Sequence, residues 1–346
     1  MKVSTCGIDL AKNVFAIHGV DDHGRTSLRK QLRRQDMAAF FARMEPCLIG
    51  MEACASAHYW ARKLTELGHT VKLMAPQFVK PYVKTNKNDA ADAEAICEAV
   101  SRPTMRFVAI KTPDQQALLA LHRARQGFVK ARTAQVNQIR GLLGEFGIVI
   151  PQGIRHVFEE LPFILDQIEE TLPASFGRLL RRLGKNLEEL DQQVWELEAE
   201  IKQWHRQSEA CRKIADIPGV GPITATAIVA SVGDALEFQN GRQLAAWLGL
   251  VPRQHSSGGK QTLLGISKRG DTYLRTLLIH GARAVIKAAE RKVIAAQSWL
   301  GRLIARRNKN VAAVALANKN ARIIWALLAK ERKFRSDYCA VARAVI

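Results

Sequence analysis

Four carboxylates stand where short apolar runs end or a helix begins: Asp9, Glu52, Asp89 and Asp92. Asp9 and Glu52 each close a run of the kind that forms a buried strand, and the two other aspartates are three residues apart. Oxygen ligands of this type suit Mg²⁺, which binds carboxylates together with substrate phosphate oxygens. The four groups therefore predict a divalent-metal site that could cut a phosphodiester bond.

The pair Asp89 and Asp92 also has a simpler interpretation. Residues at i and i+3 share a helix face, where two like charges repel unless a cation neutralises them. Acidic residues are equally typical of a first helical turn, with Asn88 or Asp89 as the cap, and for these two residues alone that interpretation is favoured. Asp9 and Glu52 shift the balance towards a metal, because strand-end carboxylates in apolar surroundings are costly unless paired or liganded.

A second candidate site lies in a polar Ser/Gly stretch between two predicted helices, one ending at Gly249 and one starting near Asp271. It offers two neighbouring hydroxyls, Ser256 and Ser257, among four basic side chains: Arg253, Lys260, Lys268 and Arg269. A flexible loop of this composition is where a phosphate could be held and attacked. The simpler alternative is a solvated linker.

The segment 217–222, Ile-Pro-Gly-Val-Gly-Pro, precedes an apolar helical run at 223–232. A glycine-rich turn leading into a helix presents backbone N–H groups to a phosphate, as in helix-hairpin-helix DNA-binding elements. Gly219 and Gly221 are therefore candidate nucleic-acid contacts. A tight helix–helix turn without a ligand remains the alternative.

The net charge of the 346-residue chain is +20, which predicts attraction to a polyanion. Residues 1–104 carry 15 basic and 11 acidic side chains, residues 105–210 carry 14 of each, and residues 211–346 carry 23 basic and 7 acidic ones. We therefore expect three parts with these boundaries, of which the C-terminal one binds the polyanion.

Six cysteines occur without a CxxC pair or zinc-type spacing, and they favour a reduced, cytosolic protein: Cys6, Cys47, Cys54, Cys97, Cys211 and Cys339. No signal peptide opens the chain, and the apolar stretches 311–317 and 323–329 are too short and too interrupted to span a bilayer. We therefore expect no membrane association.

Alternating patterns and turn residues predict an α/β N-terminal part followed by helices, which is an α/β plus α architecture. The predicted strands are 3–8, 14–20, 25–31, 47–51 and 70–74, and the predicted helices are 36–44, 56–67 and 89–100. Their order, βββαβαβα, is that of a ribonuclease-H-like fold. Residues 112–147 are helical in pattern, and an apolar 3-4 alternation from Leu183 to Trp204 predicts a coiled-coil seam, either within one chain or between protomers.

Together these segments resemble the DEDD transposases of insertion-sequence family 110, close to its 1111-like branch. The resemblance rests on five motifs in the family's order: Gly7-Ile8-Asp9-Leu10-Ala11-Lys12, Met51-Glu52-Ala53-Cys54, residues 87–93 (Lys-Asn-Asp-Ala-Ala-Asp-Ala), residues 217–221, and the block from Trp247 to Arg275. It covers the chain from residue 7 to about residue 283.

The resemblance implies a RuvC-like nuclease domain, a coiled-coil insertion, and a C-terminal transposase domain with a helix-hairpin-helix-like motif. It implies that the tetrad Asp9, Glu52, Asp89 and Asp92 binds one or two Mg²⁺ ions, for which Mn²⁺ would substitute. It places the nucleophile, which would hold DNA as a covalent phosphoserine, on Ser257, one residue from Ser256. Since tetrad and serine are far apart in the sequence, we expect the two domains to meet, in one chain or across protomers.

The resemblance also implies partners: the DNA of element ends and targets, a structured non-coding RNA that base-pairs with both, and further copies of the chain in a dimer or tetramer. It implies a bacterial cytoplasmic protein associated with the nucleoid. Two other functions remain open. One is a Holliday-junction or structure-specific endonuclease that uses metal and water, and the other is a nucleic-acid-binding protein without catalysis.

Overall fold

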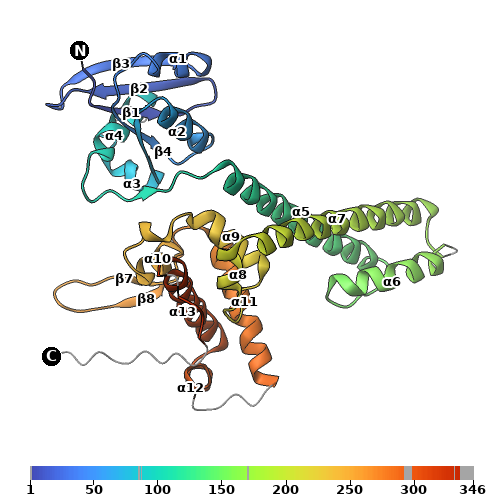
Figure 1. Cartoon of the computed structure of the whole chain (residues 1–346). Helices are drawn as coiled ribbons and strands as arrows, with labels where there is room; N and C mark the ends of the chain where they lie inside the picture. The colour runs from blue at the N-terminus through green and yellow to red at the C-terminus, as the bar shows by residue number, and fades with distance from the viewer. Residues whose placement is uncertain are drawn as a thin grey trace. The chain divides into compact units, whose positions relative to one another are not determined.

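The chain forms two compact units, residues 1–114 and 115–346, in a computed structural model (Figure 1). The structure describes residues 2–84, 86, 88–169, 171–291, 298–330 and 332–335. Lys87 of the third motif and Cys339 lie outside these residues. The three-part division at residues 104 and 210 stays a prediction about domains.

A six-stranded mixed sheet organises unit 1, with the strand order β3-β2-β1-β4-β5-β6. Three N-terminal strands form an antiparallel ribbon, and β1 then pairs in parallel with β4. The strands are β1 (Thr5–Asp9), β2 (Val14–Val20), β3 (Thr26–Arg33), β4 (Leu48–Glu52), β5 (Thr70–Met74) and β6 (Phe107–Val108). The predicted order of elements is confirmed. The short elements β6 and α3 (Pro76–Val79) were missed, because two to four residues carry no recognisable periodicity.

Helices cover both faces of this sheet: α1 (Met37–Phe41), α2 (Ala57–Glu66), α3 (Pro76–Val79) and α4 (Asp89–Val100). One face buries Ile8, Ile49 and Met51 against α1 and α2. The opposite face packs Leu48 and Met74 against α4. Alternation along the strands explains both cores, since successive side chains point to opposite faces.

The helix α4 approaches the sheet at two glycines. A Cβ at Gly7 would lie 2.2 Å from the carbonyl oxygen of Ala93, and one at Gly50 would lie 2.7 Å from the side chain of Val100. Only glycine permits such an approach of backbone to helix. The absence of a side chain at Gly7 and Gly50 therefore fixes the height of α4 above β1 and β4.

Unit 2 begins with a long helical hairpin of α5 (Pro113–Gly144), α6 (Ile154–Gln167) and α7 (Ala174–Gln207). The helices α5 and α7 run antiparallel, as the salt bridges Arg125–Glu198 and Arg132–Asp191 show. Of the predicted seam, the row Leu187, Val194 and Ile201 is buried, and a second row is half-buried: Leu183, Leu190, Leu197 and Trp204. The intrachain form of the seam is therefore confirmed.

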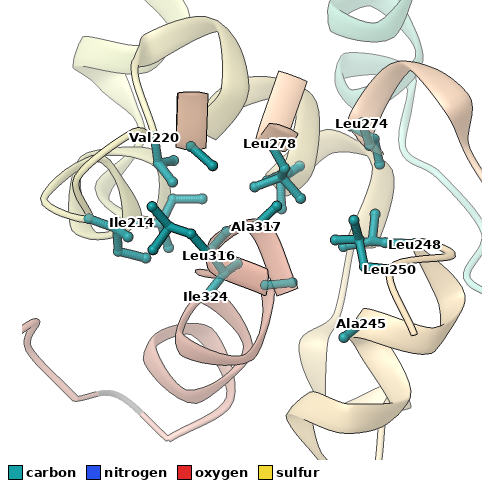
Figure 2. Packing of buried hydrophobic residues seen from close by; sticks show 14 of the residues in the cluster. Ile214, Val220, Ala245, Leu248, Leu250, Leu274, Leu278, Leu316, Ala317 and Ile324 are labelled. Atoms are coloured by element: carbon teal, nitrogen blue, oxygen red, sulfur yellow. The ribbon is translucent and has the colours of Figure 1, made fainter. Parts of the chain in front are cut away.

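The remaining helices pack around one apolar core (Figure 2), in which side chains such as Leu278, Leu316 and Ile324 meet. These helices are α8 (Glu209–Ala215), α9 (Pro222–Val232), α10 (Gly241–Trp247), α11 (Thr272–Arg291), α12 (Trp299–Arg306) and α13 (Lys309–Ala329). By length and composition α13 is apolar enough to cross a membrane. It contributes Ala317 and Ile324 to this core, which accounts for its composition.

We expect the substitution Gly7→Ala to lower the free energy of unfolding of unit 1 by on the order of 3 kcal/mol, because the new methyl group must displace the α4 backbone. The matched control is Gly127→Ala, in α5, where a Cβ meets nothing within 4 Å. That change should be neutral or stabilise by about 0.5–1 kcal/mol. Urea unfolding measures both, and equal effects of the two substitutions would contradict the close approach.

Candidate functional site

Asp9 and Glu52 end neighbouring parallel strands on the same face of the sheet. Ile8 pairs with Met51 in the β1–β4 register, so the next residues along, Asp9 and Glu52, lie at the same level. Gly7 and Gly50, two residues earlier, both face α4, and by alternation the two carboxylates face the same side. Both are half-buried, and each takes part in an interaction with another group.

The first turn of α4 lies at this same end of the sheet. The thiol of Cys97 donates to the Thr5 carbonyl oxygen at 3.6 Å, and one helical turn earlier Ala93 lies against Gly7. Because four helical residues and two strand residues each advance about 6–7 Å, α4 runs antiparallel to β1. Its N-terminal turn, with Asp89 and Asp92, therefore extends towards the level of Asp9.

Asp89 is exposed and Asp92 is half-buried, and Asn88 caps the helix by accepting a hydrogen bond from the Ala91 N–H at 2.8 Å. The cap explains the start of the helix without any role for the aspartates. Across the described ranges, no three His, Cys, Asp or Glu side chains are gathered closely enough to hold a metal ion. The backbone thus brings the four positions to one end of the sheet, and the convergence of their oxygens stays a prediction.

The thiol of Cys54 lies close to both Asp9 and Glu52. The pKa of this thiol is raised, first by desolvation and then by the negative charges of Glu52 and Asp9. Coulomb effects of this kind require short separations. Cys54 is therefore the neighbour of both carboxylates, and it stays protonated at neutral pH.

Arg34 ties together the segments that follow the two carboxylates. Its Nε donates to the Lys12 carbonyl oxygen at 2.8 Å, and its Nη2 donates to the Ser56 hydroxyl at 3.2 Å. The guanidinium also lies over the rings of Phe15 and Trp60. Ser56 has a left-handed φ of 66°, which a non-glycine residue adopts only under constraint. Sequence analysis missed Arg34, because one arginine in a basic chain gives no signal.

The predicted loop around Ser257 connects two short strands that the sequence analysis missed, β7 (Pro252–Gln254) and β8 (Leu263–Ile266), and together they form a β-hairpin that extends from the helices of unit 2 (Figure 1). Gly258 and Gly259 have positive φ values of 54° and 78°, and the Lys260 N–H donates to the Ser257 carbonyl oxygen at 3.0 Å. These are the features of a type I′ turn, which matches the twist of paired strands. Ser257 therefore sits at the hairpin tip.

Two glycines join the base of the hairpin to the helices. A Cβ at Gly249 would lie 2.0 Å from the Arg269 carbonyl oxygen, and one at Gly270 would lie 1.9 Å from that of Trp247. The buried Arg275 donates to the carbonyl oxygens of Leu248 and Arg269, each at 3.1 Å. Both ends of the hairpin are therefore anchored, although its strands are exposed.

The four predicted phosphate contacts lie along this arm: Arg253 and Lys260 in the hairpin, and Lys268 and Arg269 at its base. All four are exposed, and within the described part of the chain none is paired with a carboxylate. Cations that lack protein partners are free to bind phosphate.

The glycine-rich turn forms the predicted connection between α8 and α9, with Pro222 opening α9. Gly219 has a φ of 88°, and its backbone meets that of Gly281 in α11, where a Cβ would lie 1.8 Å from the Gly219 carbonyl oxygen. Packing therefore explains Gly219 fully. Gly221 is exposed and open, so a phosphate contact there stays a prediction.

Buried His122 links α5 of the helical hairpin to α11, the helix that follows the Ser257 hairpin (called the serine arm below). The His122 ring hydrogen-bonds the Tyr273 hydroxyl through Nδ1 and the Thr226 hydroxyl through Nε2, each at 3.0 Å. Burial, and to a smaller extent the charge of the nearby Arg125, lower the pKa of His122 to about 4. A neutral imidazole thus holds α5, α9 and α11 together.

The comparisons with known proteins agree with this organisation. Residues 6–148 match the transposase family of DEDD type, IS110, and residues 211–297 match the transposase family IS116/IS110/IS902. The chain belongs to the IS110/IS1111 family of transposases. It is a DEDD transposase, an enzyme that cleaves and transfers DNA, and its family implies a divalent metal ion. Its N-terminal part is the ribonuclease-H-like DEDD domain, with the mixed sheet described above, and a mostly helical region follows.

Three relatives illustrate the range of similarity. A probable family 20 transposase of Pseudomonas aeruginosa is 54% identical and covers 97% of this chain and 99% of its own length. The transposase for insertion sequence element IS1111A of Coxiella burnetii is 46% identical over 96% of this chain and 92% of its own. A pilin gene-inverting protein of Moraxella bovis is 31% identical over 45% of this chain and 47% of its own.

The lowered pKa of His122 makes stability depend on pH. Above about pH 6.5 its contribution is fully present, and it is lost as the pH falls towards about 4, because the unfolded chain binds the proton more tightly. We expect His122→Gln to flatten the fall in unfolding free energy over this window by on the order of 3 kcal/mol. Urea titrations at several pH values measure this, and identical slopes in both proteins would contradict it.

Proposed function

We propose that this protein moves an insertion sequence by cutting DNA strands and rejoining them through a covalent phosphoserine on Ser257. The observation that carries the proposal is the position of Ser257 at the tip of an exposed arm with four cations free of carboxylate partners. A nucleophile on such an arm can reach a DNA backbone, and the cations can hold the phosphate that it attacks.

The carboxylates supply the second half of the proposed chemistry. Asp9, Glu52, Asp89 and Asp92 offer only oxygen donors, a set that fits Mg²⁺ or Mn²⁺ and suits softer metals poorly. Their strand ends and helical turn lie at one end of one sheet. When bound, one or two such ions would polarise the scissile phosphate and stabilise the leaving 3′ oxygen.

A serine nucleophile fits transposition better than water does. Attack by Ser257 exchanges one phosphoester bond for another, so the bond energy is kept for joining the strand to a new partner. Attack by water would leave a broken strand. The P. aeruginosa and C. burnetii relatives are both named as transposases, which favours rejoining over simple cleavage.

The proposed partners are DNA, a structured non-coding RNA that pairs with element ends and target, and further copies of the chain. The charge of residues 211–346, with 23 basic and 7 acidic side chains, suits both nucleic acids. The half-buried second row of the α7 seam and the exposed ring of Trp195 support a dimer or tetramer. We place the protein in the bacterial cytoplasm, at the nucleoid.

We expect Ser257→Ala to abolish the protein–DNA adduct that survives denaturation after incubation with element-end DNA and Mg²⁺. The matched control is Ser256→Ala, which alters the adjacent hydroxyl and should leave the adduct intact. Gel electrophoresis of labelled DNA under denaturing conditions measures the adduct, and affinity for DNA should stay within about twofold in both variants, since neither hydroxyl is charged.

The other functions give different outcomes in the same assay. Free cut ends that persist in Ser257→Ala would indicate an endonuclease that uses water. Cleavage that persists in Asp9→Asn at full rate would overturn the metal site, and a wild-type protein that binds DNA without cutting it would be a binding protein only. An adduct lost in Ser256→Ala and kept in Ser257→Ala would move the nucleophile by one residue.

The proposed guide RNA predicts that one defined RNA species, encoded beside the transposase gene, co-purifies with the protein. Sequencing of RNA from the purified protein measures this, with a variant in which Arg253, Lys260, Lys268 and Arg269 are all changed to Gln as the comparison. Recovery of bulk cellular RNA without enrichment of any species would contradict guidance. Loss of the defined species in that variant would assign RNA binding to the arm.

A further inference from the structure

The two-residue turn fixes which side chains of the hairpin share a face. Three pairings give one consistent register: Ser257 with Lys260, His255 with Thr262, and Gln254 with Leu263. Side chains directly opposite each other, and those two residues apart, lie on the same face. One face therefore carries Ser257, His255 and Lys260.

The adjacent hydroxyl, Ser256, belongs to the other face. Its oxygen accepts a hydrogen bond from the Gln254 Nε2 at 3.0 Å, so a side chain two residues earlier on this strand reaches a serine hydroxyl. His255 has the same spacing to Ser257. Within the described residues its ring has no hydrogen-bond or ion-pair partner, and it is exposed beside the turn.

We infer that His255 is the catalytic base for Ser257 and that Lys260, directly across the turn, holds the phosphate under attack. This inference rests on the proposed phosphoserine chemistry and adds the group that activates the nucleophile. Histidine is the side chain that exchanges protons near neutral pH, and a nucleophilic serine requires a base within reach. A lysine ammonium on the same face supplies a positive charge to the phosphate oxygens.

Bonds and protons are conserved in both proposed steps. Neutral His255 takes the proton from the Ser257 hydroxyl while the Oγ–P bond forms and the P–O3′ bond breaks, and solvent protonates the departing 3′ oxygen. In the rejoining step a 3′ hydroxyl attacks the phosphoserine and releases its proton to solvent, the Oγ–P bond breaks, and the imidazolium returns its proton to Oγ. The base is thereby restored, and no external oxidant or reductant is needed.

The charged groups on this face of the hairpin are Arg253 and Lys260, by alternation and by pairing across the turn. Both are positive and can bind the phosphate oxygens on the face that carries Ser257. The opposite face offers Gln254, Ser256 and Gln261, none of which titrates near neutral pH. A change at His255 can therefore be compared with a change at Gln261 on the same exposed arm.

The test measures the initial rate of adduct formation in the full-length protein, across pH, for His255→Ala with and without added imidazole. We expect a loss on the order of a hundredfold or more near neutral pH, and a rate that keeps rising with pH where the wild-type rate has levelled off. Imidazole in solution should restore part of the rate. Gln261→Ala should behave as wild type, and Lys260→Gln should weaken adduct formation without any rescue by imidazole.

Two results would overturn the inference: a wild-type rate and pH profile in His255→Ala, or a loss that imidazole does not restore. Unchanged DNA affinity shows that the His255→Ala protein is folded. Ser257→Ala separates this inference from the proposed function. If Ser257→Ala still forms the adduct, the phosphoserine chemistry itself fails, whereas an adduct that needs Ser257 and not His255 refutes only the assignment of the base.

Discussion

Contact between backbones at glycine is the constraint on which both units of this protein depend. In unit 1, α4 lies so close to β1 that a single methyl group at Gly7 would meet the Ala93 carbonyl oxygen at 2.2 Å. In unit 2, Gly249 and Gly270 bring the two ends of the serine arm against each other, and Gly219 meets Gly281. Each contact sets the separation of two elements by the absence of a side chain, so it fixes geometry more sharply than adaptable apolar packing does.

These glycine contacts position candidate site residues that lie elsewhere in the chain. Gly7 is two residues from Asp9, and its contact with Ala93 aligns the first turn of α4 with the ends of β1 and β4. Gly249 and Gly270 flank the hairpin whose tip carries Ser257. The candidate residues thus lie at the ends of β1 and β4, in the first turn of α4, and at the tip of the exposed hairpin.

The carboxylate site and the Ser257 hairpin differ in how much of the surrounding structure holds them in place. Asp9 and Glu52 are half-buried, and their charges contribute to the raised pKa of Cys54. Arg34 additionally ties the Lys12 and Ser56 segments that follow them. The serine arm is exposed along its length, and its base is fixed by Arg275 while its tip is held by one turn hydrogen bond. The proposed cutting and rejoining of DNA strands depends on both features, the half-buried carboxylates and the exposed Ser257 hairpin.

The longer elements of unit 1 could be predicted from the sequence alone, because alternating apolar residues and turn residues are local signals: the predicted strands 14–20 and 70–74 and the helix 89–100 match β2, β5 and α4. The short α3 and β6 gave no such signal. The sequence also identified the four carboxylates and Ser257 as candidates. For two features, the Ser257 hairpin and Arg34, the sequence signal was misleading or absent. The segment 253–260 is rich in Ser and Gly, which indicates a loop, although Gly258 and Gly259 together make a type I′ turn. Arg34 has no distinguishing neighbours.

What the sequence determined by itself is the longer elements of unit 1, the uneven charge and the candidate site residues, since each depends on residue type and short-range order. Only the tertiary structure decided that the α7 seam is filled by α5 of the same chain, that α4 runs antiparallel to β1, and that His255 and Lys260 share a face with Ser257. These are relations between segments brought together by packing and register. No local pattern encodes them, because a shift of one residue in register would exchange one face for the other.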